Sequence, residues 1–323
     1  MADFINPFKP KKFNIYDYWE KNKMVGRYGV PYLDKELLGI SKTDLVLIGA
    51  RSGAGKSSLA RIIYNANDKA KTALFSLEDF DGSVESSIMR KEYNIITESQ
   101  YSIREWQTKT NIKIDENALK MAQENMEKQI GNSFIFGRVP PEINQDSDEE
   151  GWNIKALTDK IAWCATHGIE LIIIDHLDYL DRDNPNESDI AHITELMKAI
   201  RKAQELGSAI VAFSHLRKFA GSKNETVVPN EDEFIGSSNK VKQATQVILL
   251  APEYKQQDNN CGTWCCIRKN RYGGIKYQAA KMFFNPLTET YNQNYEMFNI
   301  NYSGTKAEQI DKTGLQTINK TSI

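Results

Sequence analysis

The amino-acid sequence predicts an α/β fold in which helices cover both faces of a mostly parallel, twisted sheet, followed by a C-terminal β extension. Short apolar runs rich in β-branched residues recur along the chain, and segments with helical periodicity separate most of them. Such alternation is typical of parallel sheets, because a connection between parallel strands must cross the sheet and is usually a helix. The expected strands span residues 44–48, 72–77, 133–136, 170–174, 209–214 and 246–251.

Two segments between these strands give the clearest helical patterns. From Ser188 to Leu206, apolar residues recur at intervals of three and four, at Ile190, Ile193, Met197 and Ile200. Ser188 is a suitable N-cap, and Gly207 ends the pattern. A second helix is expected over residues 153–167. Residues 253–284 contain shorter apolar runs, which indicate that the β extension is a hairpin-like unit.

The ends of the chain differ from its middle. Residues 1–40 contain three prolines and a small basic cluster, so we expect an N-terminal arm or linker. Within it, the amphipathic stretch over residues 15–24 could dock on another subunit. The α/β domain is then expected over residues 41–302. Residues 303–323 are polar and aperiodic, which predicts a flexible tail.

Composition excludes several classes of protein. A chain of 323 residues with 40% hydrophobic and 26% charged residues can bury a sizeable core. The formal net charge of -2 means that any nucleic-acid-binding surface must be local or must arise by assembly. No apolar stretch is long enough for a membrane span, and the first residues lack the apolar core of a signal peptide. We therefore expect a cytoplasmic protein without membrane contact.

The four cysteines do not predict a disulfide framework in a chain of this length. Three of them, Cys261, Cys265 and Cys266, lie close together and could contribute to a zinc site. No second pair completes such a site, and Cys265 and Cys266 belong to an apolar, strand-like run. We therefore expect buried thiols.

A phosphate-binding loop is predicted between the first strand and a helix over residues 58–67. Gly53 and Gly55 let the backbone wrap closely, so that its N–H groups face phosphate oxygens, and the helix N-terminus adds partial positive charge. Lys56 would reach the β- and γ-phosphates, and Ser57 would hold Mg²⁺. The expected ligands are ATP and Mg²⁺, and the expected nucleotide-binding residues are Ala50, Arg51, Ser52, Gly53, Ala54, Gly55, Lys56, Ser57 and Ser58.

A carboxylate beside this loop is expected at Asp175, which ends the apolar run over residues 171–175. In an open parallel sheet, ligands bind at the carboxyl ends of the strands. Asp175 would therefore lie beside Ser57 and orient the Mg²⁺ shell. The alternative is that Asp175 caps the next element.

Two further strand ends carry polar side chains. Glu78 follows the strand over residues 72–77, where a carboxylate could polarise an attacking water, although Asp79 and Asp81 are nearby rivals. His215 follows Ser214 at the end of another strand, where it could sense the γ-phosphate. The alternative is a surface histidine.

These motifs, in this order, resemble the C-terminal motor domain of the DnaB-type replicative helicases, a branch of the RecA-like P-loop ATPases. The loop that begins at Ala50 is similar to the family's Ala-Arg-Pro-Ser-x-Gly-Lys-Thr. The run Phe75-Ser-Leu-Glu78 matches the family's Phe-Ser-Leu-Glu, which implies that Glu78 is the catalytic base. Asp175-His-Leu-Asp-Tyr-Leu resembles the segment Asp-Tyr-Leu-Gln-Leu, and His215 replaces the usual glutamine. The resemblance implies a RecA-like core.

Two later segments extend the resemblance. Lys269-Asn-Arg271-Tyr-Gly resembles the family's Lys-x-Arg-x-Gly, which implies that Lys269 and Arg271 act on the nucleotide of the neighbouring subunit. The two residues are one apart on an apparent strand and would point to the same face. The run that begins at Gly236 resembles a pore-facing segment, and the loop after His215 is basic at its start. The expected nucleic-acid contacts are Arg217, Lys218, Ser237, Ser238, Asn239, Lys240 and Lys242.

The resemblance implies an ATP-dependent translocase or DNA helicase that works as a homo-oligomeric ring, expected to be a hexamer, on single-stranded DNA. The family's helical N-terminal domain, which recruits primase, has no counterpart in residues 1–40. We therefore expect a motor domain standing alone, with a separate loader or primase as a candidate partner. The alternative is a RecA- or KaiC-like regulatory or scaffolding ATPase that assembles with nucleotide but does not unwind DNA.

Overall fold

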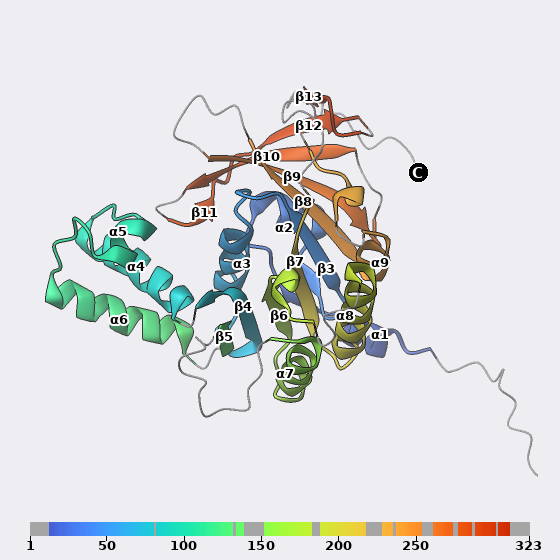
Figure 1. The fold of residues 1–323 in the computed structure, drawn as a ribbon, viewed down its shortest axis with the longest axis horizontal. Coiled ribbons are helices and arrows are strands. Elements are labelled where there is room, and N and C mark those ends of the chain that lie inside the picture. Colours follow the sequence, from blue (N-terminus) through green and yellow to red (C-terminus); the bar gives the residue numbers. More distant parts are fainter. Residues whose placement is uncertain are drawn as a thin grey trace, which may run out of the picture.

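The computed structural model describes most of the chain, and Figure 1 shows how its elements are arranged. The described residues are 13–80, 82–131, 134–138, 152–182, 188–217, 228–234, 237–253, 261–273, 277–285, 288–301 and 303–310. Within them, one sheet has the strand order β13-β12-β10-β9-β8-β3-β7-β6-β4-β5, with β11 paired to β10. A separate pair, β1 (Met24–Gly26) and β2 (Ile40–Ser41), is antiparallel.

The parallel half of the sheet confirms the predicted fold class. All six predicted strands are present, and neighbours among them run parallel. The strands at the centre are buried along nearly their whole length, as expected where helices cover both faces. The six strands of the parallel half are β3 (Leu45–Ala50), β4 (Thr72–Phe80), β5 (Phe134–Arg138), β6 (Leu171–Asp175), β7 (Ala209–His215) and β8 (Gln246–Pro252).

Alternate residues of the strands build two separate cores. Val46 and Ile48 pack with helix α3 (Lys56–Asn65), whereas Leu45 and Leu47 pack with α7 (Ile154–Thr166) and α8 (Asp189–Gln204). Figure 1 shows α3 and the pair α7 and α8 as separate groups beside the sheet. The predicted helices are thus confirmed, and the Ser188 side chain accepts a hydrogen bond from Ala191 N–H at 3.3 Å.

The C-terminal extension is antiparallel, as predicted, and continues the sheet beyond β8. It consists of β9 (Cys261–Asn270), β10 (Gln278–Asn285), β11 (Thr290–Tyr291), β12 (Glu296–Ile300) and β13 (Ala307–Gln309). The tail was predicted to begin at residue 303, but residues 307–309 form β13, which pairs with β12, so the ordered sheet extends further than expected. Residues 311–323 lie outside the described part.

Two of the cysteines on β9 are buried thiols, as predicted, whereas the side chain of Cys261 is not described. Cys265 and Cys266 are both fully buried, but they belong to different core clusters on opposite faces of the strand. Burial raises the pKa of the Cys266 thiol to about 11. The two sulfur atoms therefore cannot hold one metal ion together.

The expected boundary at residue 40 is wrong, because the core begins well before it. Helix α2 (Pro31–Leu37) and its flanks bury Tyr28, Val30 and Leu33 in the same core as α3. Pro31 begins this helix, so a residue interpreted as a linker proline instead fixes a helix start. Helix α1 (Ile15–Lys21), in contrast, has no buried residue.

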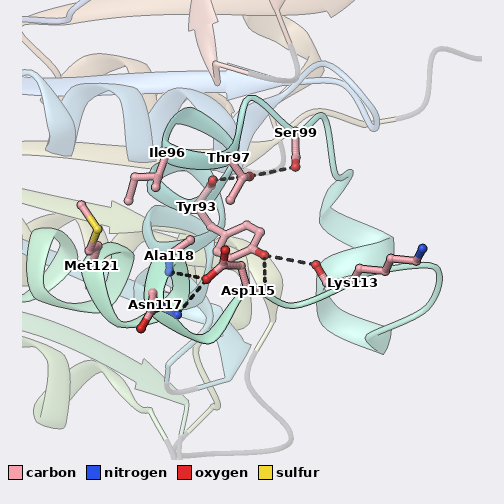
Figure 2. Close-up of a pocket in the computed structure, with 9 residues that line it drawn as sticks. All are labelled: Tyr93, Ile96, Thr97, Ser99, Lys113, Asp115, Asn117, Ala118 and Met121. Atoms are coloured by element: carbon pink, nitrogen blue, oxygen red, sulfur yellow. Dashed lines mark hydrogen bonds between the residues drawn. The ribbon is translucent and has the colours of Figure 1, made fainter.

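A helical subdomain follows β4 and lies at one side of the molecule in Figure 1. It consists of α4 (Ser83–Thr97), α5 (Ile103–Thr108) and α6 (Glu116–Ile130), with a small core around Tyr93 and Ala122. The subdomain has a pocket of about 450 Å³, and Figure 2 shows the residues that line it. Its polar groups have structural roles, since Asp115 caps α6 and the Tyr93 hydroxyl donates to the Lys113 carbonyl oxygen at 3.2 Å.

The remaining elements are short. Three single 3-10 turns, η1 (Lys69–Lys71), η2 (Leu177–Tyr179) and η3 (Glu231–Glu233), and the helix α9 (Ser237–Gln243) connect the strands. Among the helices described, none has the length and apolar character that crossing a membrane requires.

Candidate functional site

The predicted phosphate loop connects the end of β3 to the start of α3. Gly53 and Gly55 have φ angles of 78° and 79°, in the left-handed region that favours glycine, and Gly55 is the N-cap of α3. A Cβ atom at Gly53 would meet nothing within 4 Å, so backbone conformation alone requires this glycine. The first-turn N–H groups of α3 have no partner within the helix, so the loop offers donors and partial positive charge to an anion.

Arg51, which was predicted to bind nucleotide, uses several of its donors within the chain. Its main-chain N–H donates to the Leu250 carbonyl at 3.1 Å. Its side chain is buried in a two-point ion pair with Glu233, through Nε–Oε2 at 2.9 Å and Nη2–Oε1 at 2.8 Å. Arg51 therefore fixes the loop against η3.

Two other predicted loop residues also shape the loop. Ala54 N–H donates to the Arg51 carbonyl, and the Ala50 carbonyl accepts from Leu216 N–H, both at 3.1 Å. The predicted phosphate donors that remain are Ser52, Gly53, Gly55, Lys56, Ser57 and Ser58.

Lys56 places a cation at the centre of the site. Its side chain is buried, and its Nζ lies 3.1 Å from Nε2 of His215. Burial lowers the pKa of Lys56, while the carboxylates of Asp175 and Glu78 oppose this shift. Lys56 and His215, which were both predicted for the site, are therefore in contact.

Ser57 and Asp175 meet, as predicted for a Mg²⁺ site. Asp175 is 2% exposed at the end of β6, and its carboxylate accepts a hydrogen bond from the Ser57 hydroxyl. Burial raises the pKa of Asp175, and the hydrogen bond from Ser57 lowers it. In the described structure its Oδ1 has no hydrogen-bond partner. A buried, unpaired carboxylate oxygen beside a hydroxyl fits the oxygen ligands of Mg²⁺.

Glu78 is the best-placed of the candidate bases. It lies on β4, two residues beyond the Ser76–Asp175 pair, and its side chain is 41% exposed. Its rival Asp79 accepts from Ser76 Oγ at 3.5 Å and lies 3.6 Å from a guanidinium nitrogen of Arg61. Asp81 lies outside the described residues.

Asp178, which the sequence analysis assigned no role, is the polar centre of the site. Its Oδ1 accepts from Lys240 Nζ at 3.0 Å and from Ser214 Oγ at 3.2 Å, and its Oδ2 accepts from His215 N–H at 2.5 Å. Burial would raise the pKa of Asp178, but contact with His176 and the charge of Lys240 hold it well below its usual range. The available signal was the run Asp-His-Leu-Asp directly after a buried strand.

Lys240 was predicted to contact nucleic acid in an open channel, but its side chain does not face one. Its side chain is fully buried, and Nζ also donates to Ser214 Oγ at 2.7 Å. The ammonium group is drawn inward because Asp178 provides the opposite charge that a buried lysine needs. Lys240 therefore links α9 to the end of β7.

The other predicted nucleic-acid contacts are placed less completely. Lys242 and Arg217 are exposed, on α9 and directly after β7 respectively. Ser237, Ser238 and Asn239 begin α9, but their side chains are not described, and Lys218 lies outside the described residues.

Lys269 and Arg271 lie at the opposite end of the sheet from the phosphate loop. Asn270 pairs with Gln246 at the start of β8, whereas Leu250 pairs with Ala50 beside the loop. Four residues of strand separate these levels, or roughly 13 Å. The pair is therefore distant from the phosphate loop of its own chain.

The predicted common face of Lys269 and Arg271 is wrong. Strand β9 ends at Asn270, so Arg271 lies in the following turn, where it is exposed. Lys269 Nζ instead donates to the Val241 carbonyl at 2.6 Å, at the C-terminal end of α9. Arg271 is thus the exposed cation of the pair.

Comparison with known proteins extends this description. A family model for the DnaB-like helicase C terminal domain matches residues 27–293. The replicative DNA helicase DnaB of Treponema pallidum is 25% identical over 273 residues, which is 80% of this chain and 54% of the relative. The DnaB of Haemophilus influenzae is 23% identical over 229 residues, 69% of this chain and 45% of the relative. The chain thus spans about half the length of these relatives.

Solved structures show the same fold at low identity. One solved ATPase domain superposes with a TM-score of 0.64 at 18% identity, over 86% of this chain and 95% of that domain. A DnaB-like replicative helicase, whose structure was described with its interactions with primase, gives 0.63 at 19% identity, over 86% of this chain and 66% of that one. A KaiC-like protein from Pyrococcus horikoshii gives 0.52 at 14% identity, over 82% and 97%.

Proposed function

We propose that this chain, which belongs to the DnaB-like helicase C-terminal domain family, hydrolyses ATP between the subunits of a homo-oligomeric ring and uses the energy to move along single-stranded DNA. The observation that carries the proposal is the set of groups at the carboxyl ends of adjacent parallel strands. There the loop donors, Lys56 and the Ser57–Asp175 pair fit the phosphates and the metal ion of MgATP.

In this proposal different residues bind the phosphates and the metal ion. The free N–H groups of the loop and the Lys56 ammonium hold the β- and γ-phosphates. Ser57 binds Mg²⁺, and Asp175 orients its shell. Mg²⁺, when bound, neutralises the negative charge that phosphoryl transfer develops on the phosphate oxygens.

Glu78 orients the attacking water and accepts its proton. Its side chain is exposed enough for water to reach it, whereas Asp79 lies 3.6 Å from a guanidinium nitrogen of Arg61. His215, in contact with Lys56, lies where loss of the γ-phosphate changes its surroundings. Both residues therefore act at the γ-phosphate end of the site.

The ring is supported by the position of Arg271. An exposed arginine that is distant from the phosphate loop of its own chain can supply its charge to a neighbouring copy. Helix α1 gives independent support, because Tyr16, Tyr18 and Trp19 leave half or more of their side chains exposed. Exposed aromatic clusters of this kind are often covered by a partner. We propose a hexamer, with Lys242, Arg217 and Lys218 facing the nucleic acid.

A second candidate is a KaiC-like regulatory ATPase that assembles with nucleotide and does not translocate. The observation that favours it is the burial of Lys240, which removes one of the two α9 lysines from any nucleic-acid surface. Either function leaves room for a separate loader or primase protein as a partner.

ATP turnover measured against protein concentration, with and without single-stranded DNA, tests the proposal. We expect specific turnover to rise with concentration as subunits assemble, and to rise further with DNA in a salt-dependent manner. Lys56→Ala should abolish nucleotide binding or turnover, whereas Lys120→Ala, at an exposed position on α6, should behave like the wild type. Concentration-independent turnover would contradict hydrolysis between subunits. Indifference to DNA would favour the regulatory ATPase.

A further inference from the structure

Two imidazoles and one carboxylate converge at the carboxyl edge of the sheet. Glu78 comes from β4, His176 directly follows β6, and His215 ends β7. One ligand atom from each residue lies within 4.8 Å of the others. Both histidines stand where the resembled family carries other residues, so the cluster is a feature of this chain.

His176 is buried without a hydrogen bond. Its side chain is 1% exposed, and in the described structure neither ring nitrogen has a hydrogen-bond partner. Nε2 lies 3.2 Å from Glu78 Oε2, and Nδ1 lies 3.4 Å from Asp178 Oδ2. A buried imidazole whose nitrogens face carboxylate oxygens without a hydrogen bond of good geometry can serve as a metal ligand, and Nε2 of His176 and Oε2 of Glu78 are close enough to bind one ion together.

Nε2 of His215 is a nitrogen with a lone pair, which a metal ligand must have. The Lys56 ammonium can only donate, so Nε2 of His215, 3.1 Å away, must be the accepting nitrogen. Its lone pair therefore points toward the Lys56 ammonium, and it is available to a metal ion only where the ion replaces that contact. A metal ion and the Lys56 ammonium would compete for this nitrogen.

The surrounding groups hold the two imidazoles in place. Asp178 lies beside His176 Nδ1 and accepts from the main-chain N–H of His215. Asp178 is fixed in turn by Lys240. A carboxylate behind a histidine is the usual outer-shell arrangement of zinc sites, because it orients the ring and increases its basicity.

We propose that Glu78, His176 and His215 bind a divalent transition-metal ion, Zn²⁺ in the first place, with a fourth position open to water or to a phosphate oxygen. Two imidazoles and a carboxylate with one open position are a common zinc donor set. Mg²⁺ prefers oxygen ligands, so this site is distinct from the one at Ser57 and Asp175. Glu78 and His215 also belong to the proposed ATPase site, so Glu78 cannot act as the catalytic base while it binds this ion, but binding of the ion does not itself depend on ATP hydrolysis.

Calorimetric titration of the tag-free chain with Zn²⁺, without nucleotide or Mg²⁺, tests the site, and visible absorption of Co²⁺ reports its geometry. We expect one equivalent to bind, with a tetrahedral Co²⁺ spectrum. His176→Gln, His215→Gln and Glu78→Gln should each weaken binding at least about tenfold, since even outer-shell changes cost that much. His167→Gln, at an exposed histidine after α7, is the matched control and should bind as the wild type does.

Glu78→Gln protects the test against misfolding, because Glu78 is the most exposed of the three side chains. Absence of Zn²⁺ binding to the wild type would overturn the inference. So would unchanged binding by all three variants, which would place the ion elsewhere on the chain. ATP turnover is measured separately, so an active enzyme that binds no Zn²⁺ refutes the metal site alone.

Discussion

At the scale of single residues, Asp178 decides how the edge of the sheet is organised. Its carboxylate contacts His176, His215 and Lys240, which come from three different segments. The Lys240 side chain is only 1% exposed, so water cannot replace the carboxylate as its partner. Loss of this carboxylate would therefore disturb the α9 contact and the position of His215 together.

We expect Asp178→Asn to destabilise the protein by roughly 3 kcal/mol at neutral pH, because it leaves the buried Lys240 without its counter-charge. The folded-state pKa of Asp178 is lowered, so its stabilisation is complete above about pH 4, the ordinary value for aspartate, and is lost as the pH falls through the folded-state pKa. The difference in unfolding free energy between wild type and variant should narrow below that pH.

Urea unfolding over a series of pH values measures this difference. Asp159→Asn is the control, since Asp159 pairs with Lys155 at a distance of 2.8 Å on the surface and should contribute no more than about 1 kcal/mol. A difference for Asp178→Asn that stayed constant down to the lowest pH would show that the carboxylate titrates normally.

The sequence was informative about residues that follow buried strands and uninformative about side-chain partners distant in sequence. Lys56, Ser57 and Asp175 were predicted correctly to meet, because the carboxyl ends of neighbouring parallel strands lie together. The burial of Lys240 and the pairing of Arg51 with Glu233 depend on contacts across 62 and 182 residues. No local pattern encodes such contacts.

At the scale of elements, the apolar strands were predictable and the short or mixed ones were not. Buried parallel strands must be apolar on both faces, which produces continuous runs such as residues 171–175. Helix α2 and strand β13 are short and carry charged or polar residues, so they resembled linker and tail. Contacts with neighbouring elements stabilise them, although neither has a continuous apolar run of its own.

Glu289 joins the helical subdomain to the C-terminal sheet. Its Oε1 accepts from Arg90 Nη2 at 2.6 Å and from Ser87 Oγ at 2.8 Å, and the Arg90 side chain is 1% exposed. Two residues of α4 are thus attached to the turn between β10 and β11. The subdomain has its own small core, so this contact fixes its placement.

We expect Glu289→Ala to lower the unfolding free energy by about 3–5 kcal/mol, because it leaves Arg90 buried without an opposite charge. Chemical denaturation followed by circular dichroism measures the loss. Glu205→Ala is the matched control, since Glu205 pairs with Arg201 on the surface at 3.8 Å and should cost less than about 1 kcal/mol. Equal losses in the two variants would contradict a structural role for the buried pair.

At the scale of the whole molecule, the phosphate loop and Arg271 lie at opposite ends of the same sheet. We expect Arg271→Ala to keep ATP binding and to lose turnover by about 10³-fold or more, as the loss of a charge supplied by a neighbouring subunit does. Arg104→Ala, at an exposed position on α5, should retain both. Fluorescent-nucleotide binding and steady-state turnover distinguish the two properties.

Mixing two inactive variants gives a sharper test of hydrolysis between subunits. Neither Lys56→Ala nor Arg271→Ala should turn over ATP alone, but a mixture should regain part of the activity. In mixed assemblies some interfaces pair an intact phosphate loop with an intact Arg271. A mixture as inactive as its components would show that Arg271 acts within its own chain or not at all.

The separation of these two surfaces also has a stoichiometric consequence. A subunit that receives a cation beside its phosphate loop and supplies Arg271 to a neighbour at its other end associates head to tail. Such polymers either close into rings or continue as filaments. An open chain of n copies has n − 1 completed junctions, whereas a closed one has n. Closure of the ring would therefore add one working junction without adding any protein. Opening the ring to admit a nucleic-acid strand would remove that junction.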